Sequence, residues 1–288
     1  MGVKKGLYEK VINRTISSSL AEERARLMVE KEKIDKVMGR KIFASYLATV
    51  IEQGLKYLES DPEAVDSQIR LVNGMIERLA LDVQDEELQE FLVQEDQLLR
   101  AIYESEKGYK VPLTSVAHTS LFTGAKSEPR IYSELIKEIS SADRIDFLIS
   151  FIRFSGLRLI LPALKEHTKA GKPLRVITTS YMGATDYKAV EALAKLSNTK
   201  VKVSYDTKRT RLHAKAYYFH RETGFSTAYI GSSNMSRAAL TDGLEWNLKI
   251  SEHTSPDVLE KYRATFEIYW NSKDFEVFDP TLDLDRQR

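Results

Sequence analysis

The sequence predicts an α/β protein in which an N-terminal all-α helical bundle is followed by an α/β/α sandwich with a mixed sheet. Between Leu7 and about Glu106, apolar residues recur at three- and four-residue steps, without the alternation typical of strands. Chain-breaking residues then interrupt the pattern, namely Gly108, Pro112, Gly124 and Pro129. Beyond them, near-continuous apolar stretches alternate with amphipathic ones, which indicates a sheet covered on both faces. We therefore predict two domains, residues 1–115 and 116–288.

Apolar stripes predict the helices of the first domain. The first stripe comprises Ile42, Tyr46, Leu47, Val50, Ile51, Leu55 and Leu58. Asp61-Pro62-Glu63 then supplies an N-cap and a proline at the first helical position. The second stripe comprises Ile69, Val72, Met75, Ile76 and Leu79, and a further helix is predicted from Leu88, Phe91, Leu92, Leu98, Leu99 and Ile102. Because residues 1–115 contain no histidine, we expect a separate interaction or dimer-supporting module.

The second domain is predicted to alternate helices and strands. We expect helices over 129–140, 157–170 and 188–195, with strands over 144–151, 174–179 and 200–205 between and after them. Three further strands follow, over 212–219, 228–231 and about 243–247, the first two joined by a polar hairpin. Binding sites in such sheets form where strands end. The loops after these strands are therefore the places to look for chemistry.

Composition limits the functional classes. The 288 residues include no cysteine, which excludes disulfides and thiolate metal sites and suits a cytoplasmic protein. No apolar run reaches the roughly 18 residues of a membrane span, so we expect no membrane partner. Residues 1–125 carry 17 Lys and Arg against 21 Asp and Glu, whereas residues 126–288 carry 26 against 21. The second domain is therefore modestly basic, which is compatible with a phosphate substrate but far weaker than the basic face of a dedicated DNA-binding protein.

One constellation of residues carries a definite chemical meaning. His213 and Lys215 are two apart on a predicted strand, so they share one face, while Leu212, Ala214 and Ala216 face the opposite layer. The next strand ends in Gly231-Ser232-Ser233-Asn234, whose glycine permits close backbone approach and whose polar side chains offer donors to a phosphate. We expect Glu245, on the following strand, to orient an imidazole of the site. Together these are the parts of a phosphodiesterase.

This pattern resembles the phospholipase D superfamily, whose signature is His-x-Lys, an Asp a few residues on, then Gly-Ser-x-Asn and a downstream Glu. The matching positions are His213, Lys215, Gly231, Ser232, Asn234 and Glu245. The sequence departs from the signature where the Asp would fall, near His220, and in a longer hairpin. A closer resemblance, over roughly Thr119 to Trp270, is to the nuclease-like domain at the N-terminus of some bacterial DEAD/DEAH-type helicases. It implies a helicase motor C-terminal to this chain.

The resemblance also implies a mechanism without metal or cofactor. In that superfamily a histidine forms a covalent phosphohistidine and a second histidine protonates the leaving group. Carried onto this chain, His213 is the nucleophile, Lys215, Asn234 and Ser232 bind the phosphate, and Glu245 orients a histidine. His167-Thr168-Lys169 repeats the spacing but falls on a predicted helix, where residues two apart do not share a face. With one complete motif per chain, the resemblance implies a homodimer with the active site at its two-fold interface.

Further substrate contacts are expected in the loops around this motif. Arg153 follows the first strand of the second domain, and Thr179 and Ser180 end the next. Arg211 lies in a basic run just before the motif, and Ser233 lies inside the phosphate-binding turn. All five are predicted to bind substrate.

Three functions remain open at this level. The first is a metal-independent nuclease, with DNA expected as substrate rather than RNA. The second is a phospholipase, against which stands the absence of any amphipathic membrane-facing stretch. The third is a module that docks on nucleic acid for an attached motor without catalysis. Cleavage of labelled DNA, or of phospholipid vesicles, in excess EDTA distinguishes them.

Overall fold

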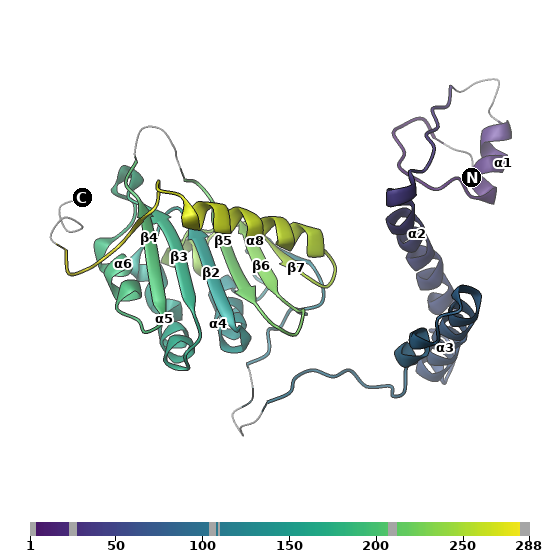
Figure 1. The fold of residues 1–288 in the computed structure, drawn as a ribbon, viewed down its shortest axis with the longest axis horizontal. Coiled ribbons are helices and arrows are strands. Elements are labelled where there is room, and N and C mark those ends of the chain that lie inside the picture. Colours follow the sequence, from purple (N-terminus) through teal and green to yellow (C-terminus); the bar gives the residue numbers. More distant parts are fainter. Residues whose placement is uncertain (1–3, 23–27, 104–107, 109, 207–211, 283–288) are drawn as a thin grey trace. The chain divides into compact units, whose positions relative to one another are not determined.

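The computed structural model describes residues 4–22, 28–103, 108, 110–206 and 212–282. The chain divides into two compact units, Met1–Arg100 and Ala101–Arg288. The predicted domain boundary at residues 115–116 falls inside the second unit. Each unit is described below by itself, and both are drawn in Figure 1.

The first unit is helical. It contains α1 (Arg14–Glu22), α2 (Lys36–Tyr57), α3 (Ala64–Val83) and a short 3₁₀ helix, η1 (Glu86–Phe91). Helix α2 begins where the Asp35 carboxylate accepts hydrogen bonds from the backbone N–H groups of Val37 and Met38, at 2.8 and 3.2 Å. The N-cap of α3 is Glu63, so Pro62 lies in the turn before the helix, not at its first position. Helix α3 ends at Gln84, which adopts left-handed backbone angles (φ 56°).

The further helix predicted from residues 88–102 is wrong. After η1 ends at Phe91, the described chain contains no helix up to residue 103. The Asn73 side chain of α3 accepts from the backbone N–H of Val93 and donates to its carbonyl, at 2.9 and 3.0 Å. Both backbone groups of Val93 are therefore paired with α3, and this tertiary contact replaces the helical hydrogen bonds that the apolar spacing predicted.

The second unit is built on one mixed sheet of eight strands. The strands are β1 (Ser120–Phe122), β2 (Arg144–Ile149), β3 (Leu174–Thr179), β4 (Thr199–Ser204), β5 (Lys215–His220), β6 (Thr227–Gly231), β7 (Asn247–Ser251) and β8 (Glu276–Val277). Their order is β1-β7-β6-β5-β2-β3-β4-β8. The pairs β2–β3 and β3–β4 are parallel and all others antiparallel. The predicted mixed sheet is confirmed.

Helices cover both faces of this sheet. They are α4 (Ile131–Ser141), α5 (Phe154–Lys169), η2 (Tyr181–Gly183), α6 (Tyr187–Ala194), α7 (Arg237–Leu240) and α8 (Pro256–Asn271). Ile145, Phe147 and Ile149 of β2 enter the main core with α4, α5 and α6. Leu148 faces the other way and packs with Phe266 of α8, which crosses the strands in Figure 1. This alternation is what a strand buried between two layers requires, and it confirms the predicted α/β fold.

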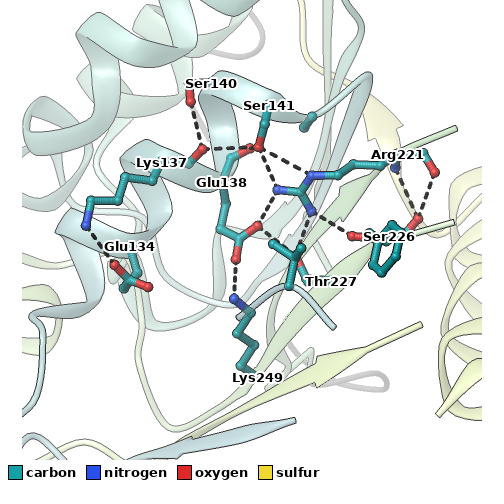
Figure 2. A network of polar contacts seen from close by, with 12 residues as sticks. Glu134, Lys137, Glu138, Ser140, Ser141, Arg221, Ser226, Thr227 and Lys249 are labelled. Atoms are coloured by element: carbon teal, nitrogen blue, oxygen red, sulfur yellow. Dashed lines mark hydrogen bonds and ion pairs between the residues drawn. The ribbon is translucent and has the colours of Figure 1, made fainter. Parts of the chain in front are cut away.

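A buried network of charges joins α4 to β6, to β7 and to the residue that follows β5. The Glu138 carboxylate is fully buried and receives Arg221 at 2.5 Å and Lys249 at 2.8 Å, two cations that are themselves buried. Thr227 and Tyr229 donate hydroxyl hydrogen bonds to the same carboxylate at 2.8 and 3.0 Å. In Figure 2 the Arg221 guanidinium also reaches Ser141. Burial alone raises the pKa of Glu138, but the two cations outweigh it and hold that pKa below its ordinary value.

Candidate active site

The predicted site residues that the structure describes gather at one edge of the sheet. Strands β2, β3 and β6 end at this edge, whereas β5 and β7 begin there. The register fixes this arrangement, because Ile149 pairs with Lys215 and Gly231 pairs with Asn247. The edge therefore includes the carboxyl ends of the parallel strands, where ligands bind in α/β sheets.

His213 and Lys215 lie together at the centre of this edge. The Lys215 ammonium donates toward Nδ1 of His213 at 3.1 Å and to the His213 carbonyl at 2.9 Å. His213 is exposed, whereas Lys215 is only 8% exposed. The predicted shared face is confirmed, and Leu212, Ala214 and Ala216 pack on the opposite side with Phe266. One detail differs, because β5 begins at Lys215 and His213 lies in the segment leading into it.

This arrangement has a direct chemical consequence. The ammonium lies close to both ring nitrogens, Nδ1 at 3.1 Å and Nε2 at 3.3 Å, and an imidazole nitrogen with a free lone pair can act as a nucleophile. The ammonium that contacts it is a positive group beside the place where a phosphate would bind. Burial lowers the pKa of Lys215, and the nearby charge of Glu245 opposes that shift.

The loop after β2 holds this histidine segment in place. The backbone N–H and the hydroxyl of Ser150 both donate to the carbonyl of Ala214, each at 2.8 Å. The Phe151 ring stands edge-on to the His213 imidazole, with centroids 6.2 Å apart and planes at 80°. Neither residue is among the predicted site residues. The only signal for them is their place directly after a buried strand.

Asn234 reaches the site through pairing of two loops across the start of β5. The loop after β6 and the loop after β2 exchange backbone hydrogen bonds, from Met235 N–H to the Phe151 carbonyl at 3.1 Å and from Arg153 N–H to the Met235 carbonyl at 2.8 Å. The Asn234 side-chain oxygen accepts from the Phe151 N–H at 3.3 Å. Its amide nitrogen has no partner among the described residues and remains a donor for an oxyanion.

Gly231, at the end of β6, allows two segments of the sheet to pack closely. A Cβ on Gly231 would lie 2.1 Å from the Trp246 carbonyl oxygen, because the segment leading into β7 passes directly over it. Only glycine permits that approach. The close backbone approach expected at Gly231 is therefore made by the protein's own chain.

Ser232 and Glu245 form a pair on the exposed side of the turn. The Ser232 hydroxyl donates to the Glu245 carboxylate and accepts from the Trp246 N–H at 3.0 Å. Glu245 lies in the loop before β7, so its expected place on a strand is wrong. The expected contact with an imidazole is absent among the described residues, where the carboxylate binds Ser232.

Two of the predicted substrate contacts are corrected by burial. Ser233 is fully buried, accepts from the Asn247 side chain at 2.8 Å and binds the carbonyl of Ala239. Thr179 is also fully buried, donates to the Ser204 carbonyl and accepts from the Tyr181 N–H, both at 3.1 Å. Both hydroxyls are out of reach of a substrate. They close turns behind the site, because their positions at strand ends put them under the neighbouring loops.

The remaining predicted contacts lie at the rim. Ser180 is half-buried and donates to the Ser204 carbonyl at 3.4 Å. Arg153 is exposed and pairs with Asp186 at 2.7 Å, while the same carboxylate accepts from the Phe154 N–H at 2.8 Å and so caps α5. Arg211 lies outside the described residues.

The other four histidines lie toward the opposite edge of the sheet. His118 precedes β1, His167 is buried in the last turn of α5, His220 ends β5 and His253 follows β7. His220, at the position of the family's Asp, is separated from Lys215 by the length of β5, about 17 Å. It lies 3.4 Å from the hydroxyls of Tyr218 and Ser226. It therefore takes no part in the site of this chain.

The described residues contain no group of three or more His, Cys, Asp or Glu side chains placed to hold a metal ion. Within the same residues, no helix has the length and apolar character needed to cross a membrane.

Part of the chain matches a known protein family. Residues 135–270 match the family described as cardiolipin synthase, PLD-like domain. Among curated protein sequences, none matches the chain.

Solved structures with a similar fold include NucT from Helicobacter pylori, at 21% identity and a TM-score of 0.42, covering 52% of this chain and 93% of that one. Nuc from Salmonella typhimurium, a phospholipase D family member, is also 21% identical, with a TM-score of 0.43 and coverage of 56% and 99%. A polyphosphate kinase from Porphyromonas gingivalis is 14% identical, with a TM-score of 0.38 and coverage of 49% and 20%.

Proposed function

From the phospholipase D-like domain in residues 135–270, we propose that this chain is a metal-independent phosphodiesterase that cleaves nucleic acid, DNA rather than RNA. The observation that carries the proposal is the contact between the Lys215 ammonium and the exposed His213 ring, with the Asn234 amide brought to the same edge. This contact supports His213 as the nucleophile and Lys215 and Asn234 as phosphate-binding groups.

The proposed reaction runs in two displacements. The His213 nitrogen attacks the phosphorus, a P–N bond forms, and the P–O bond to the leaving nucleotide breaks as that oxygen receives a proton. Water then attacks the phosphohistidine and gives a proton to the group that protonated the leaving oxygen, the P–N bond breaks, and the phosphate end and the free imidazole are released. Lys215 and Asn234 stabilise the nonbridging oxygens as negative charge develops in each step. Ser232 adds a hydroxyl beside them, held by Glu245.

The leaving oxygen needs a proton, and in the proposed mechanism a second histidine supplies it. With His213 as nucleophile, none of the other four histidines of the chain lies at this edge. We propose a homodimer in which His213 of a second copy is the acid, through the self-complementary contact typical of two-fold dimers. Exposed apolar side chains beside Glu245 support a protein contact there, with Leu244 84% and Trp246 62% exposed.

The charges around the site support a polyanionic substrate. Two exposed cations begin helices at this edge, Lys188 in the first turn of α6 and Arg237 at the start of α7, while Arg153 at the N-cap position of α5 is paired with Asp186. The Lys188 ammonium lies 4.3 Å from the centre of the Phe154 ring, beside the start of α5. Cations spaced along this edge fit a chain of phosphates better than a single headgroup. On the sequence resemblance alone, we further propose that the chain is the nuclease part of a helicase–nuclease.

The decisive experiment omits metal. The protein is incubated in excess EDTA with labelled DNA, labelled RNA and phosphatidylcholine vesicles, and products are separated. We expect cleavage of DNA. Hydrolysis of phosphatidylcholine alone would assign a phospholipase, whereas DNA binding without products, with or without added Mg²⁺, would assign a docking module.

Asn234→Ala should lower the rate of DNA cleavage on the order of 10²-fold, because it removes one donor to the transition-state oxyanion. The Michaelis constant should change less than the turnover number, since the charge develops only in the transition state. Asn271→Ala, at the exposed end of α8, is the matched control and should cleave at the wild-type rate. An unchanged turnover number in Asn234→Ala, with a normal circular dichroism spectrum, would remove this residue from the mechanism.

A further inference from the structure

The first unit has almost no fully buried residue, although several apolar side chains between its helices are half-buried. Among its described residues, only Ser19, Gly39 and Ala80 are buried, and none of them is a large apolar side chain. A helical unit of this size normally gains its stability from packing apolar stripes, since isolated helices are marginal in water. The stripes of α2 and α3 therefore need a partner surface.

Helix α2 presents a continuous apolar stripe to solvent. Phe43, Leu47, Val50 and Tyr57 recur at steps of four, three and seven residues and are 47, 55, 46 and 85% exposed. This is the spacing of one seam along a helix that packs against another helix. Helix α3 presents a second stripe, in which Met75, Leu79 and Val83 are 40, 52 and 54% exposed. Neighbouring exposed apolar stripes of this kind mark a surface that contacts another protein.

The two segments that carry these stripes, α2 and α3–η1, have net charges of opposite sign. Helix α2 carries four Lys and Arg against one Glu, whereas α3 and η1, with the residues between them, carry seven Asp and Glu against two Arg. Lys36 and Arg40 at the start of α2 are exposed and have no ion-pair partner among the described residues, and the same holds for Glu86, Glu87 and Glu90 of η1. In a two-fold pair, the basic helix of each copy can face the acidic segment of the other. One surface is then complementary to itself.

We propose that the α2 and α3 stripes form a dimerisation surface on which the same helices of a second copy dock, α2 of each copy against the α3–η1 segment of the other. The contact stands apart from catalysis, since these residues include none of the site. It would also hold two nuclease domains in one assembly, which is the condition that the proposed reaction sets. Each nuclease domain carries one motif, and the dimer would hold the second nuclease domain near it at a high effective concentration.

The test measures the mass of the full chain by analytical ultracentrifugation across a dilution series. Leu47→Glu/Val50→Glu places two charges on the stripe and should weaken dimerisation by at least about tenfold. Ser45→Glu/Thr49→Glu adds the same charges one turn apart on the opposite side of α2 and should leave the dimer intact. A stripe variant with the wild-type dissociation constant, or a wild-type chain that is monomeric at tens of micromolar, would overturn the proposal.

A charge exchange identifies the second copy as the occupant. Lys36→Glu/Arg40→Glu should weaken the dimer, and adding Glu86→Lys/Glu87→Lys to that variant should restore it, with both effects reduced at high salt. If stripe variants stay dimeric and still cleave DNA, the helical surface is refuted while the nuclease stands. If the stripe controls the mass but no variant, wild type included, cleaves DNA, the nuclease is refuted while the surface stands.

Discussion

His213→Ala should abolish DNA cleavage, with a loss of roughly 10⁴- to 10⁶-fold in turnover number, the range seen when a covalent nucleophile is removed. The reason is that no other described imidazole lies at the site edge, so neither copy of a dimer could form the phosphohistidine. The fold should survive, because the ring is exposed and its packing partner is the edge of Phe151. The measurement is a metal-free cleavage time course beside a circular dichroism spectrum.

The matched control is His253→Ala. It removes another exposed ring, which stacks on Phe225 at 5.5 Å near the opposite edge of the sheet. Its activity should equal that of the wild type. Full cleavage by His213→Ala would refute the nucleophile and, with it, the histidine-dependent mechanism.

Lys215→Ala tests the effect of removing the positive charge while the imidazole nucleophile is kept. The imidazole remains, but the buried ammonium that contacts it is gone, so the nonbridging oxygens lose their nearest positive charge. We expect cleavage to fall below detection here as well. Trapping distinguishes the two variants: because a phosphohistidine is stable in base and labile in acid, quenching in alkaline denaturant should show slow labelling of the protein in Lys215→Ala and none in His213→Ala.

Glu138→Ala should lower the free energy of unfolding of the second unit by about 3–5 kcal/mol, the usual cost of breaking a buried ion pair. Arg221 and Lys249 would remain buried with their counter-charge removed, and the hydroxyls of Thr227 and Tyr229 would lose their acceptor. Both tryptophans of the chain, Trp246 and Trp270, belong to this unit, so fluorescence during urea unfolding reports on it alone.

The control for Glu138→Ala is a variant that breaks an ion pair on the surface. Glu191→Ala removes a partner of Lys195 on α6, at 2.9 Å but with the lysine side chain 62% exposed, and should cost about 0.5 kcal/mol or less. A cost for Glu138→Ala as small as that of Glu191→Ala would mean that the three buried charges do not act as a unit.

The stability that Glu138 contributes should depend on pH. Because the folded-state pKa of Glu138 lies below its ordinary value, its contribution to stability is complete above the unfolded-state pKa, about 4.3. The contribution is lost as the pH falls through the lowered pKa. The stability difference between the wild type and Glu138→Gln should therefore be largest near neutral pH and shrink in acid.

The sequence by itself determined the class of fold and the centre of the proposed site. Period-two geometry is local, so the common side of His213 and Lys215, and the opposite side of Leu212 and Ala216, followed from spacing alone. The alternation of apolar and amphipathic segments likewise predicted a sheet between helices, because burial on both faces demands continuous apolar strands. The resemblance to phospholipase D proteins rested on the same local motif.

Only the tertiary structure decided which polar groups face a substrate. Ser233 and Thr179 have the same side-chain chemistry as exposed Ser232, yet neighbouring loops cover them and use their hydroxyls. Glu245 binds Ser232 because the segment before β7 passes over Gly231, a contact between residues far apart along the chain. The pairing of Glu138 with Arg221 and Lys249, like the loss of the helix after Phe91, depends on partners that no local period encodes. Hydrogen-bond partners across a fold are set by packing, and a pattern of spacing along the chain does not contain them.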